Sequence, residues 1–128
     1  MKIYVGHSNS FDYHKELYIP IRKSNINTKH TIIFPHEFDS NPFDSKTLFT
    51  EGCDFFIAEI SYPATGLGIE LAWAQMMGVP IVSIYRKDKK PSGSACMISN
   101  QVCSYESVEE MIWLFQLVTR QKLKIQES

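Results

Sequence analysis

The sequence predicts an α/β domain in which helices cover both faces of a parallel sheet. The first observation is alternation, because short runs of β-branched and aromatic residues are separated by segments whose apolar residues have helical spacing. The second is that these runs are continuously apolar, as in residues 54–60 and 80–85. Strands have this composition when both of their faces are buried, as they are in parallel sheets.

Five strands and the helices between them can be placed on the chain. Strands are expected at residues 2–6, 30–34, 54–60, 80–85 and 101–104. Helices are expected at residues 12–25, 45–52, 67–77 and 108–122, and Pro20 should bend or interrupt the first of them. Residues 87–93 form a charged loop with Pro91 and Gly93. This order predicts a five-stranded, doubly wound, flavodoxin-like sheet with ligands at the carboxyl ends of its strands.

Composition narrows the class of protein. The 128 residues, 44% hydrophobic and 21% charged, suit one domain over residues 1–128. The formal net charge is −1 and the basic residues fall in small separate groups, which argues against binding a nucleic acid polymer. The chain starts directly with a strand and has no run of about eighteen apolar residues, so we expect no membrane association and a cytoplasmic protein. Three cysteines without a close pair predict reduced thiols and no metal site.

The most informative segment is SYPATGLGIELAWA, residues 61–74, which follows the apolar run 54–60. Gly66 and Gly68 allow close backbone approach, and the free amides at the start of the helix suit an anion or a sugar oxygen. We expect Glu70 in the first turn of this helix, where the positive helix end would keep it ionised, as a nucleophile requires. The alternative is a carboxylate that only interacts favourably with the helix dipole.

The residues from Asp54 to Ile60 and the G-x-G-x-E-L core of residues 66–71 resemble the nucleoside 2-deoxyribosyltransferase superfamily, including its 2'-deoxynucleoside 5'-monophosphate N-glycosidases. The resemblance extends from Ile3-Tyr4 to about Ile98. It implies that Glu70 attacks C1' of the sugar and forms a glycosyl-enzyme ester, which water or a second base resolves, as in retaining glycosidases. It also implies a nucleoside or nucleotide substrate and no metal or organic cofactor.

Two further residues take roles from this resemblance. Tyr4 matches a family tyrosine beside the nucleophile; the alternative is an ordinary strand aromatic. Ser94 lies in a segment similar to a family S-A-M-I motif with Cys96 inserted. There it matches a serine that reaches the substrate phosphate in a neighbouring subunit. Its alternative is a polar loop serine that caps the turn.

The chain also departs from the family pattern. Lys46 stands where the family usually has an aspartate that protonates or orients the leaving base. Asp44 could take that role, or could be the N-cap of the following helix. The phosphate-binding arginines and the serine after the loop proline are absent, and the residue after Pro63 is Ala64. Hydrogen bonds from Thr65, Ser8 and Ser10 could replace them.

Other side chains near the predicted strand ends have two interpretations each. His7 and His36 could donate to a base or a phosphate, or could be solvated loop residues. Glu59 matches an acid often seen in the family and is expected to support the loop at residues 63–68. The helix at residues 67–77 is apolar on two faces, which predicts a homodimer or higher oligomer near this helix unless neighbouring helices cover it.

The leading hypothesis is therefore an enzyme that cleaves or transfers at the N-glycosidic bond of a nucleoside or nucleoside monophosphate. Glu70 would be the nucleophile, with Tyr4 as its partner and Gly66 and Gly68 shaping the sugar site. The alternative is a non-catalytic nucleotide-binding or signalling module that kept the fold and the loop, as Lys46 in place of the acid permits. The base, the phosphate requirement, the kind of pentose and the choice between hydrolysis and transfer stay open.

Overall fold

A computed structural model of the chain describes the backbone of residues 1–127 and the side chains of residues 1–121. Its five strands form one sheet in the order β2-β1-β3-β4-β5, and every neighbouring pair is parallel. The strands are β1 (Lys2–His7), β2 (Thr31–Ile33), β3 (Phe55–Glu59), β4 (Ile81–Arg86) and β5 (Gln101–Tyr105). The predicted flavodoxin-like, doubly wound sheet is confirmed.

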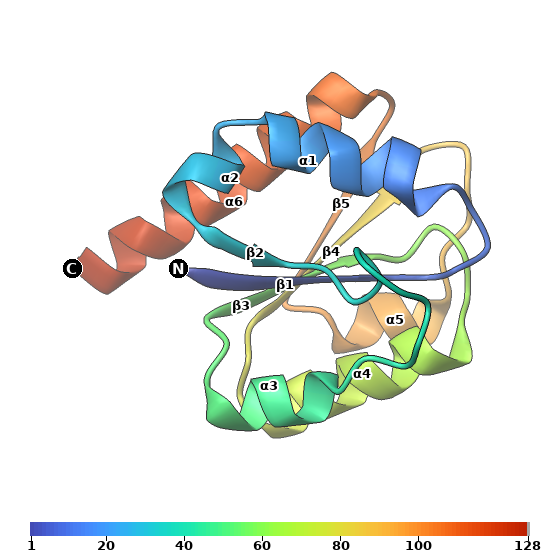
Figure 1. Cartoon of the computed structure of the whole chain (residues 1–128), viewed down its shortest axis with the longest axis horizontal. Helices are drawn as coiled ribbons and strands as arrows, with labels where there is room; N and C mark the ends of the chain where they lie inside the picture. Colours follow the sequence, from blue (N-terminus) through green and yellow to red (C-terminus); the bar gives the residue numbers. More distant parts are fainter. Residues whose placement is uncertain (128) are drawn as a thin grey trace.

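Helices cover both faces of this sheet, as the continuously apolar strands predict. They are a π-helical turn η1 (His14–Tyr18), α1 (Ile19–Lys23), α2 (Ile26–Lys29), α3 (Ser45–Glu51), α4 (Thr65–Met76), α5 (Gly93–Ile98) and α6 (Val108–Glu127). Figure 1 shows α1, α2 and α6 on one face and α3, α4 and α5 on the other. The strands run away from the side where both chain ends lie, so their carboxyl ends meet at the opposite edge (Figure 1).

The two faces of the sheet bury two separate apolar cores. On β1, Ile3 and Val5 pack in the core beneath α1 and α6, whereas Tyr4 packs in the core beneath α3 and α4. Phe56 and Ala58 on β3 belong to the same core as Tyr4. The two-residue period of a strand therefore directs the Tyr4 side chain toward the helix that carries Glu70.

Proline and glycine explain where the helices differ from prediction. The helix expected at residues 12–25 is interrupted as predicted, because Pro20 has no N–H to donate to the preceding turn and lies at the start of α1. Two short helices, α2 and α5, were not predicted. The α5 segment GSACMI begins with glycine and serine, which have low helix propensity, and it is held by packing between α4 and β4.

The predicted position of Glu70 in its helix is wrong by one turn. Helix α4 begins at Thr65, because Ala64 is extended and its carbonyl accepts the first helical hydrogen bond, from the N–H of Gly68 at 3.0 Å. Glu70 is therefore the sixth residue of α4 and lies in its second turn. The helix-end charge is felt mainly within the first turn, so another influence must set the ionisation of this carboxylate.

Candidate active site

Two pockets lie at the carboxyl edge of the sheet, on either side of the residues that begin α4. The Glu70 pocket, about 250 Å³, is walled by the end of β1, the loop after β2, the start of α3 and α4. The Ser94 pocket, about 440 Å³, lies between the loop at residues 60–65, α4 and α5. Ala64 and Leu67 line both. A ligand with two chemically different parts could extend from one pocket into the other.

The two pockets divide the residues proposed from the sequence. The Glu70 pocket is lined by Tyr4, Ser8, Gly66 and Glu70. The Ser94 pocket is lined by Thr65, Gly68 and Ser94. A Cβ built at Gly66 or Gly68 would meet no described atom within 4 Å, so the space beside both glycines is open to a ligand. Asp44 lines neither pocket and borders a neighbouring hollow instead.

A short hydrogen bond joins the two residues at the centre of the Glu70 pocket. The Tyr4 hydroxyl donates to Glu70 Oε2 with an O···O distance of 2.5 Å. The Tyr4 ring is fully buried, stacks on Phe43 at 5.5 Å and meets Phe49 and Phe56 edge-on. Burial, followed by the negative charge of Glu70, raises the pKa of Tyr4 well above its usual range. Tyr4 is therefore a fixed donor that orients one carboxylate oxygen and leaves the other free.

Burial also changes the ionisation expected of Glu70. It raises the pKa of the carboxyl, while the hydrogen bond from Tyr4 opposes the rise. The prediction that the helix end keeps Glu70 ionised is thus replaced by a balance between desolvation and the Tyr4 hydrogen bond. Ser45 Oγ is fully buried at the start of α3 and makes no well-formed hydrogen bond to a described residue.

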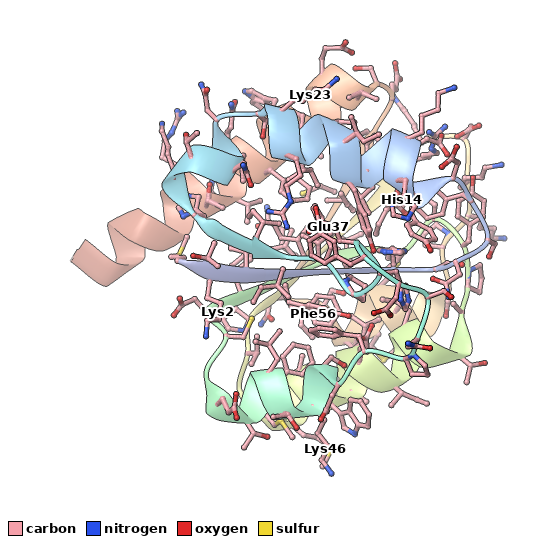
Figure 2. All side chains as sticks on the ribbon, in the orientation of Figure 1. Lys2, His14, Lys23, Glu37, Lys46 and Phe56 are labelled. Atoms are coloured by element: carbon pink, nitrogen blue, oxygen red, sulfur yellow. The ribbon has the colours of Figure 1, made fainter. Side chains whose placement is uncertain are left out.

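Gly6 allows the strand to lie close to this pair, a role that the sequence did not reveal. A Cβ at Gly6 would lie 2.8 Å from two ring carbons of Phe56 and 3.3 Å from Glu70 Oε1. Phe56 is buried between the sheet and the α3 and α4 layer and has little room to move (Figure 2). Any side chain at position 6 would therefore displace either the aromatic core or the carboxylate.

Neither residue near the family position of the leaving-group acid is placed as an acid in the Glu70 pocket. Asp44 is exposed and caps α3: its Oδ1 accepts from the Thr47 N–H at 3.1 Å and its Oδ2 accepts from the Thr47 hydroxyl at 2.6 Å. These bonds lower the pKa of Asp44, which opposes proton donation. Lys46 is exposed on α3 and points away from the body of the protein (Figure 2).

His7 lies in the Glu70 pocket, but both of its ring nitrogens are occupied. Nδ1 lies 2.7 Å from the carbonyl oxygen of Ser8, which can only accept, so Nδ1 carries the proton. Nε2 lies 2.5 Å from the Tyr18 hydroxyl, which donates to it. Burial lowers the pKa of His7 to about 4. The imidazole is thus held in one neutral tautomer and is not poised to transfer a proton.

His36 differs from His7 in having a free nitrogen. It follows β2 in the turn at residues 35–36 and lines the Glu70 pocket. Its backbone N–H donates to the Tyr18 hydroxyl at 3.2 Å, which fixes the position of the turn. Its Nδ1 is buried and has no hydrogen-bond partner among the described residues. The imidazole therefore presents unused hydrogen-bonding capacity next to the pocket.

Glu59 supports the loop that separates the two pockets. It is fully buried at the end of β3, its Oε1 accepts from the Ser61 N–H at 2.6 Å, and its Oε2 accepts from the Tyr105 hydroxyl. The Ser61 hydroxyl in turn accepts from the N–H of Arg86 at 2.8 Å. Burial raises the pKa of Glu59. This network fixes the chain two residues before Pro63, whereas the hydrogen bonds of Glu59 within the described part of the chain reach Ser61 and Tyr105 and not residues 63–68 as predicted.

The described residues give no sign of a metal centre or a membrane span. Among them, no group of three or more histidine, cysteine, aspartate or glutamate side chains is placed to hold a metal ion. None of the helices in that part of the chain is both long and apolar enough to cross a bilayer. Cys53, Cys96 and Cys103 are unpaired thiols.

Part of the chain is similar in sequence to two curated proteins of the same name. Over 76 residues the chain is 28% identical to the protein named "Putative 2'-deoxynucleoside 5'-phosphate N-hydrolase 1" of Syntrophotalea carbinolica, a match over 57% of this chain and 54% of the relative. It is 30% identical over 76 residues to the protein of the same name from Thermofilum pendens, over 55% and 52% of the two chains. This chain is a distant homologue of those proteins.

The homologous segment spans about half the length of these curated relatives. No protein-family model matches the chain. Among solved structures, the Clostridium botulinum CMP N-glycosidase BcmB superposes with a TM-score of 0.64, over 92% of this chain and 99% of BcmB, at 18% identity. A conserved protein from Enterococcus faecalis V583 superposes with a TM-score of 0.55 over 87% and 94%, at 15% identity. These likenesses show a shared fold.

Several residues that line the Glu70 pocket were proposed from the sequence, but others were not. Phe43, Ser45 and Trp73 line the Glu70 pocket and were not proposed, and neither was Gly6. Their only sequence signal is position: Phe43 and Ser45 flank Asp44, and Trp73 follows Glu70 by three residues on the same helix. Contacts between residues that lie far apart in the chain cannot be inferred from such local signals.

Proposed function

We propose that this protein cleaves the N-glycosidic bond of a 2'-deoxynucleoside 5'-phosphate or a closely related nucleotide, with Glu70 as the nucleophile. The observation that carries the proposal is the 2.5 Å hydrogen bond from Tyr4 to Glu70 Oε2 inside a pocket at the carboxyl ends of the strands. Distant homology to proteins named as nucleotide N-hydrolases supports the substrate class.

The geometry suits nucleophilic catalysis at a sugar carbon. Tyr4 fixes Oε2, so Oε1 is the oxygen that would bond to C1' as the glycosidic C–N bond breaks. Burial raises the pKa of Glu70, which makes its ionised form a stronger base than an exposed carboxylate. Water then attacks C1', and the ester bond to Glu70 breaks with release of the sugar phosphate. No metal or organic cofactor takes part in these steps.

The remaining parts of the nucleotide would occupy the two pockets, which share Ala64 and Leu67 as lining residues. The sugar would lie against Tyr4, Glu70 and the open side of Gly66. The phosphate would extend over the first turn of α4, whose amides have no side-chain cap, toward Thr65 and Ser94 in the second pocket. Ser8, which lines the first pocket, would contribute a further hydrogen bond.

We further propose that the active form is a homodimer built on α4 and α5. Within the described residues, one side of α4 packs in the core while Ile69, Met76 and Met97 of α4 and α5 are 46%, 83% and 87% exposed. Helices of the same chain therefore leave these side chains uncovered. Ile69 also lines the Glu70 pocket, so a second subunit on this surface would adjoin the active site.

A panel of nucleosides and nucleoside monophosphates tests the activity. The protein is incubated with each compound, with and without an acceptor base, and free or exchanged base is measured by chromatography. We expect base release from at least one 2'-deoxynucleoside 5'-phosphate, and loss of that release by at least about 1,000-fold in Glu70→Gln. Release that survives unchanged in Glu70→Gln would contradict the nucleophile assignment.

A second candidate function is a nucleotide-binding module without catalysis. The observation that favours it is the exposed Lys46 where the family has its acid, together with Asp44 engaged as a helix cap. The same panel separates the two candidates. Calorimetric binding of nucleotides, without turnover of any compound, would support the module and exclude the enzyme.

A further inference from the structure

The N-glycosidase proposed above needs a group that protonates the departing base, and neither Asp44 nor Lys46 is placed for it. Expelling a nucleobase as an anion is difficult, so a proton donor commonly lowers the barrier by about 10²- to 10⁴-fold. The candidates for such a donor are the titratable side chains that line the Glu70 pocket. These are Tyr4, His7, His36 and Glu70.

Three of these four are already engaged. Tyr4 donates its only proton to Glu70, and Glu70 is the proposed nucleophile. His7 donates from Nδ1 to the Ser8 carbonyl and accepts at Nε2 from Tyr18. His36 alone among the four has a buried nitrogen without a hydrogen-bond partner in the described residues. Buried polar atoms in native proteins are nearly always paired, so the unpaired nitrogen of this pocket-lining residue points to a missing partner.

A second unpaired atom supports this location. Ser45 Oγ, fully buried, is the other buried side-chain polar atom without a partner in the described part of the chain, and it lines the same pocket. Two residues with unpaired polar atoms thus line one pocket from different elements, the turn after β2 and the start of α3. Phe43, which stacks on Tyr4, lines the wall with them and offers an aromatic surface to a planar ring.

We infer that His36 is the leaving-group acid of this site, replacing the aspartate of the family, and that Ser45 is a second hydrogen-bonding contact to the substrate beside Glu70. The inference rests on the proposed N-glycosidase function and names the residues that face the base. It predicts a substrate whose base has a nitrogen or oxygen acceptor that becomes protonated when the glycosidic bond breaks.

Protons and electrons balance over the two steps of the proposed reaction. Glu70 Oε1 forms a bond to C1' while the C1'–N bond breaks and its electron pair stays on the base. The His36 imidazolium gives the base a proton from its ring and becomes neutral. In the second step the water oxygen bonds to C1', the ester to Glu70 breaks, and the water proton returns to His36. One histidine therefore serves as acid and then as base.

The surroundings of His36 are compatible with this exchange. Its ring lies 6.0 Å, between centroids, from each of His7 and Tyr13, and His7 is held neutral. The adjacent Glu37 is held away in an ion pair, since its two oxygens accept from Arg22 at 2.7 Å each. Glu70 is the remaining charged group that lines the pocket with it. A protonated imidazole would thus share the pocket with the negative charge of the proposed nucleophile.

The test compares two leaving groups in matched variants. The natural substrate from the panel needs a proton on its base, whereas 4-nitrophenyl 2-deoxyriboside, with a 5'-phosphate if the natural substrate needs one, releases a stable phenolate. We expect His36→Gln to lower kcat/KM for the natural substrate by about 10²- to 10⁴-fold and for the nitrophenyl compound by less than about 5-fold. His14→Gln, an exposed histidine outside both pockets, is the control and should change neither.

Other results would contradict the role of His36. If His36→Gln lowers kcat/KM equally for both substrates, or for neither, the inference is overturned while the nucleophile proposal stays intact. A loss restricted to the natural substrate in Asp44→Asn, and absent in His36→Gln, would assign the acid to Asp44. Loss of activity on both substrates in Glu70→Gln supports the proposed function independently of His36.

A binding measurement keeps the inference testable if the protein turns nothing over. Histidine labelled with ¹⁵N is followed by NMR while the nucleoside monophosphate that binds best is added to wild type and to Ser45→Ala. Shifted His36 ring resonances together with at least about 5-fold weaker binding by Ser45→Ala would support the substrate contacts of His36 and Ser45, while the absence of turnover would overturn the acid role of His36. Unshifted His36 resonances would overturn the His36 contact.

Discussion

The Tyr4 hydroxyl on β1 and Glu70 Oε2 on α4, 66 residues apart in the chain, form a hydrogen bond of 2.5 Å. The bond exists because the two-residue period of β1 directs Tyr4 to the face of the sheet that α4 covers. It links the fold to the proposed chemistry, because it orients a carboxylate whose pKa is raised by burial.

Removing this hydroxyl should shift the pH profile of catalysis. The Tyr4 hydrogen bond lowers the pKa of Glu70, so Tyr4→Phe should raise it and move the acidic limb of kcat/KM to higher pH. The variant should also lose about 10- to 100-fold in kcat/KM, the usual effect of losing a hydrogen bond to a charged group. Rates of base release between pH 4 and pH 8 measure both effects. An unmoved limb would show that Tyr4 does not act through Glu70.

Gly6→Ala should damage the protein through contact with Phe56. The new methyl group would lie 2.8 Å from the buried ring, and overpacking of this kind costs about 1–3 kcal/mol in the free energy of unfolding. Gly68→Ala is the matched control, because nothing lies within 4 Å of its Cβ and alanine favours a helix. Urea unfolding should show Gly6→Ala less stable and Gly68→Ala unchanged or more stable than wild type. Equal stability of all three would contradict the close approach.

His7 should make the protein less stable in acid. Its pKa is lowered from 6.5 to about 4, so between these values the unfolded chain binds a proton that the native protein does not. The free energy of unfolding should therefore fall by on the order of 2–3 kcal/mol as the pH drops from about 6.5 to about 4. Urea unfolding of His7→Gln over the same range should show a smaller fall. Parallel curves would mean that His7 is not held neutral.

Two substitutions of Asp44 separate a helix cap from a catalytic acid. Serine can accept the Thr47 N–H as aspartate does, whereas alanine cannot. Asp44→Ser should keep the melting temperature near that of wild type and Asp44→Ala should lower it, with base release retained by both variants. Loss of base release in both, at unchanged melting temperature, would instead make Asp44 the acid.

The exposed apolar surface of α4 and α5 should mediate dimer formation. Met76→Lys and Met97→Lys place charges on it and should convert a dimer into a monomer in light-scattering measurements of mass. Trp113→Lys on α6 is the control, since Trp113 is 56% exposed on the other face of the sheet. A wild-type protein that is monomeric at all concentrations would refute the proposed dimer.

The sequence was most informative where one local rule controls the structure. Apolar runs located the first four strands within a few residues, the short run at residues 101–104 located the fifth, and Pro20 marked the interruption of the first helix. The short helices α2 and α5 escaped prediction because packing, and not local propensity, holds them. The start of α4 was misplaced because Thr65 and the glycines after it favour no single position for a helix end.

The residues of the candidate site were also predictable from the sequence only where a local motif marks them. Glu70 and Tyr4 were proposed from motifs, and the structure brings them into contact. Their raised pKa values depend on burial, which only the packed chain reveals. The unpaired atoms of His36 and Ser45 likewise became visible only when their neighbours were known. Chain-distant contacts of this kind leave no local signal in a single sequence.

The most direct test of the central claim, that Glu70 is a nucleophile, is to trap the ester. A 2'-fluoro analogue of the preferred nucleotide slows both steps at C1', and a good leaving group speeds the first step alone, so the ester to Glu70 accumulates. Intact-mass and peptide mass spectrometry should find the fluorosugar on the peptide that contains Glu70, and no adduct in Glu70→Gln. Base release without any adduct, or an adduct on another residue, would contradict the account.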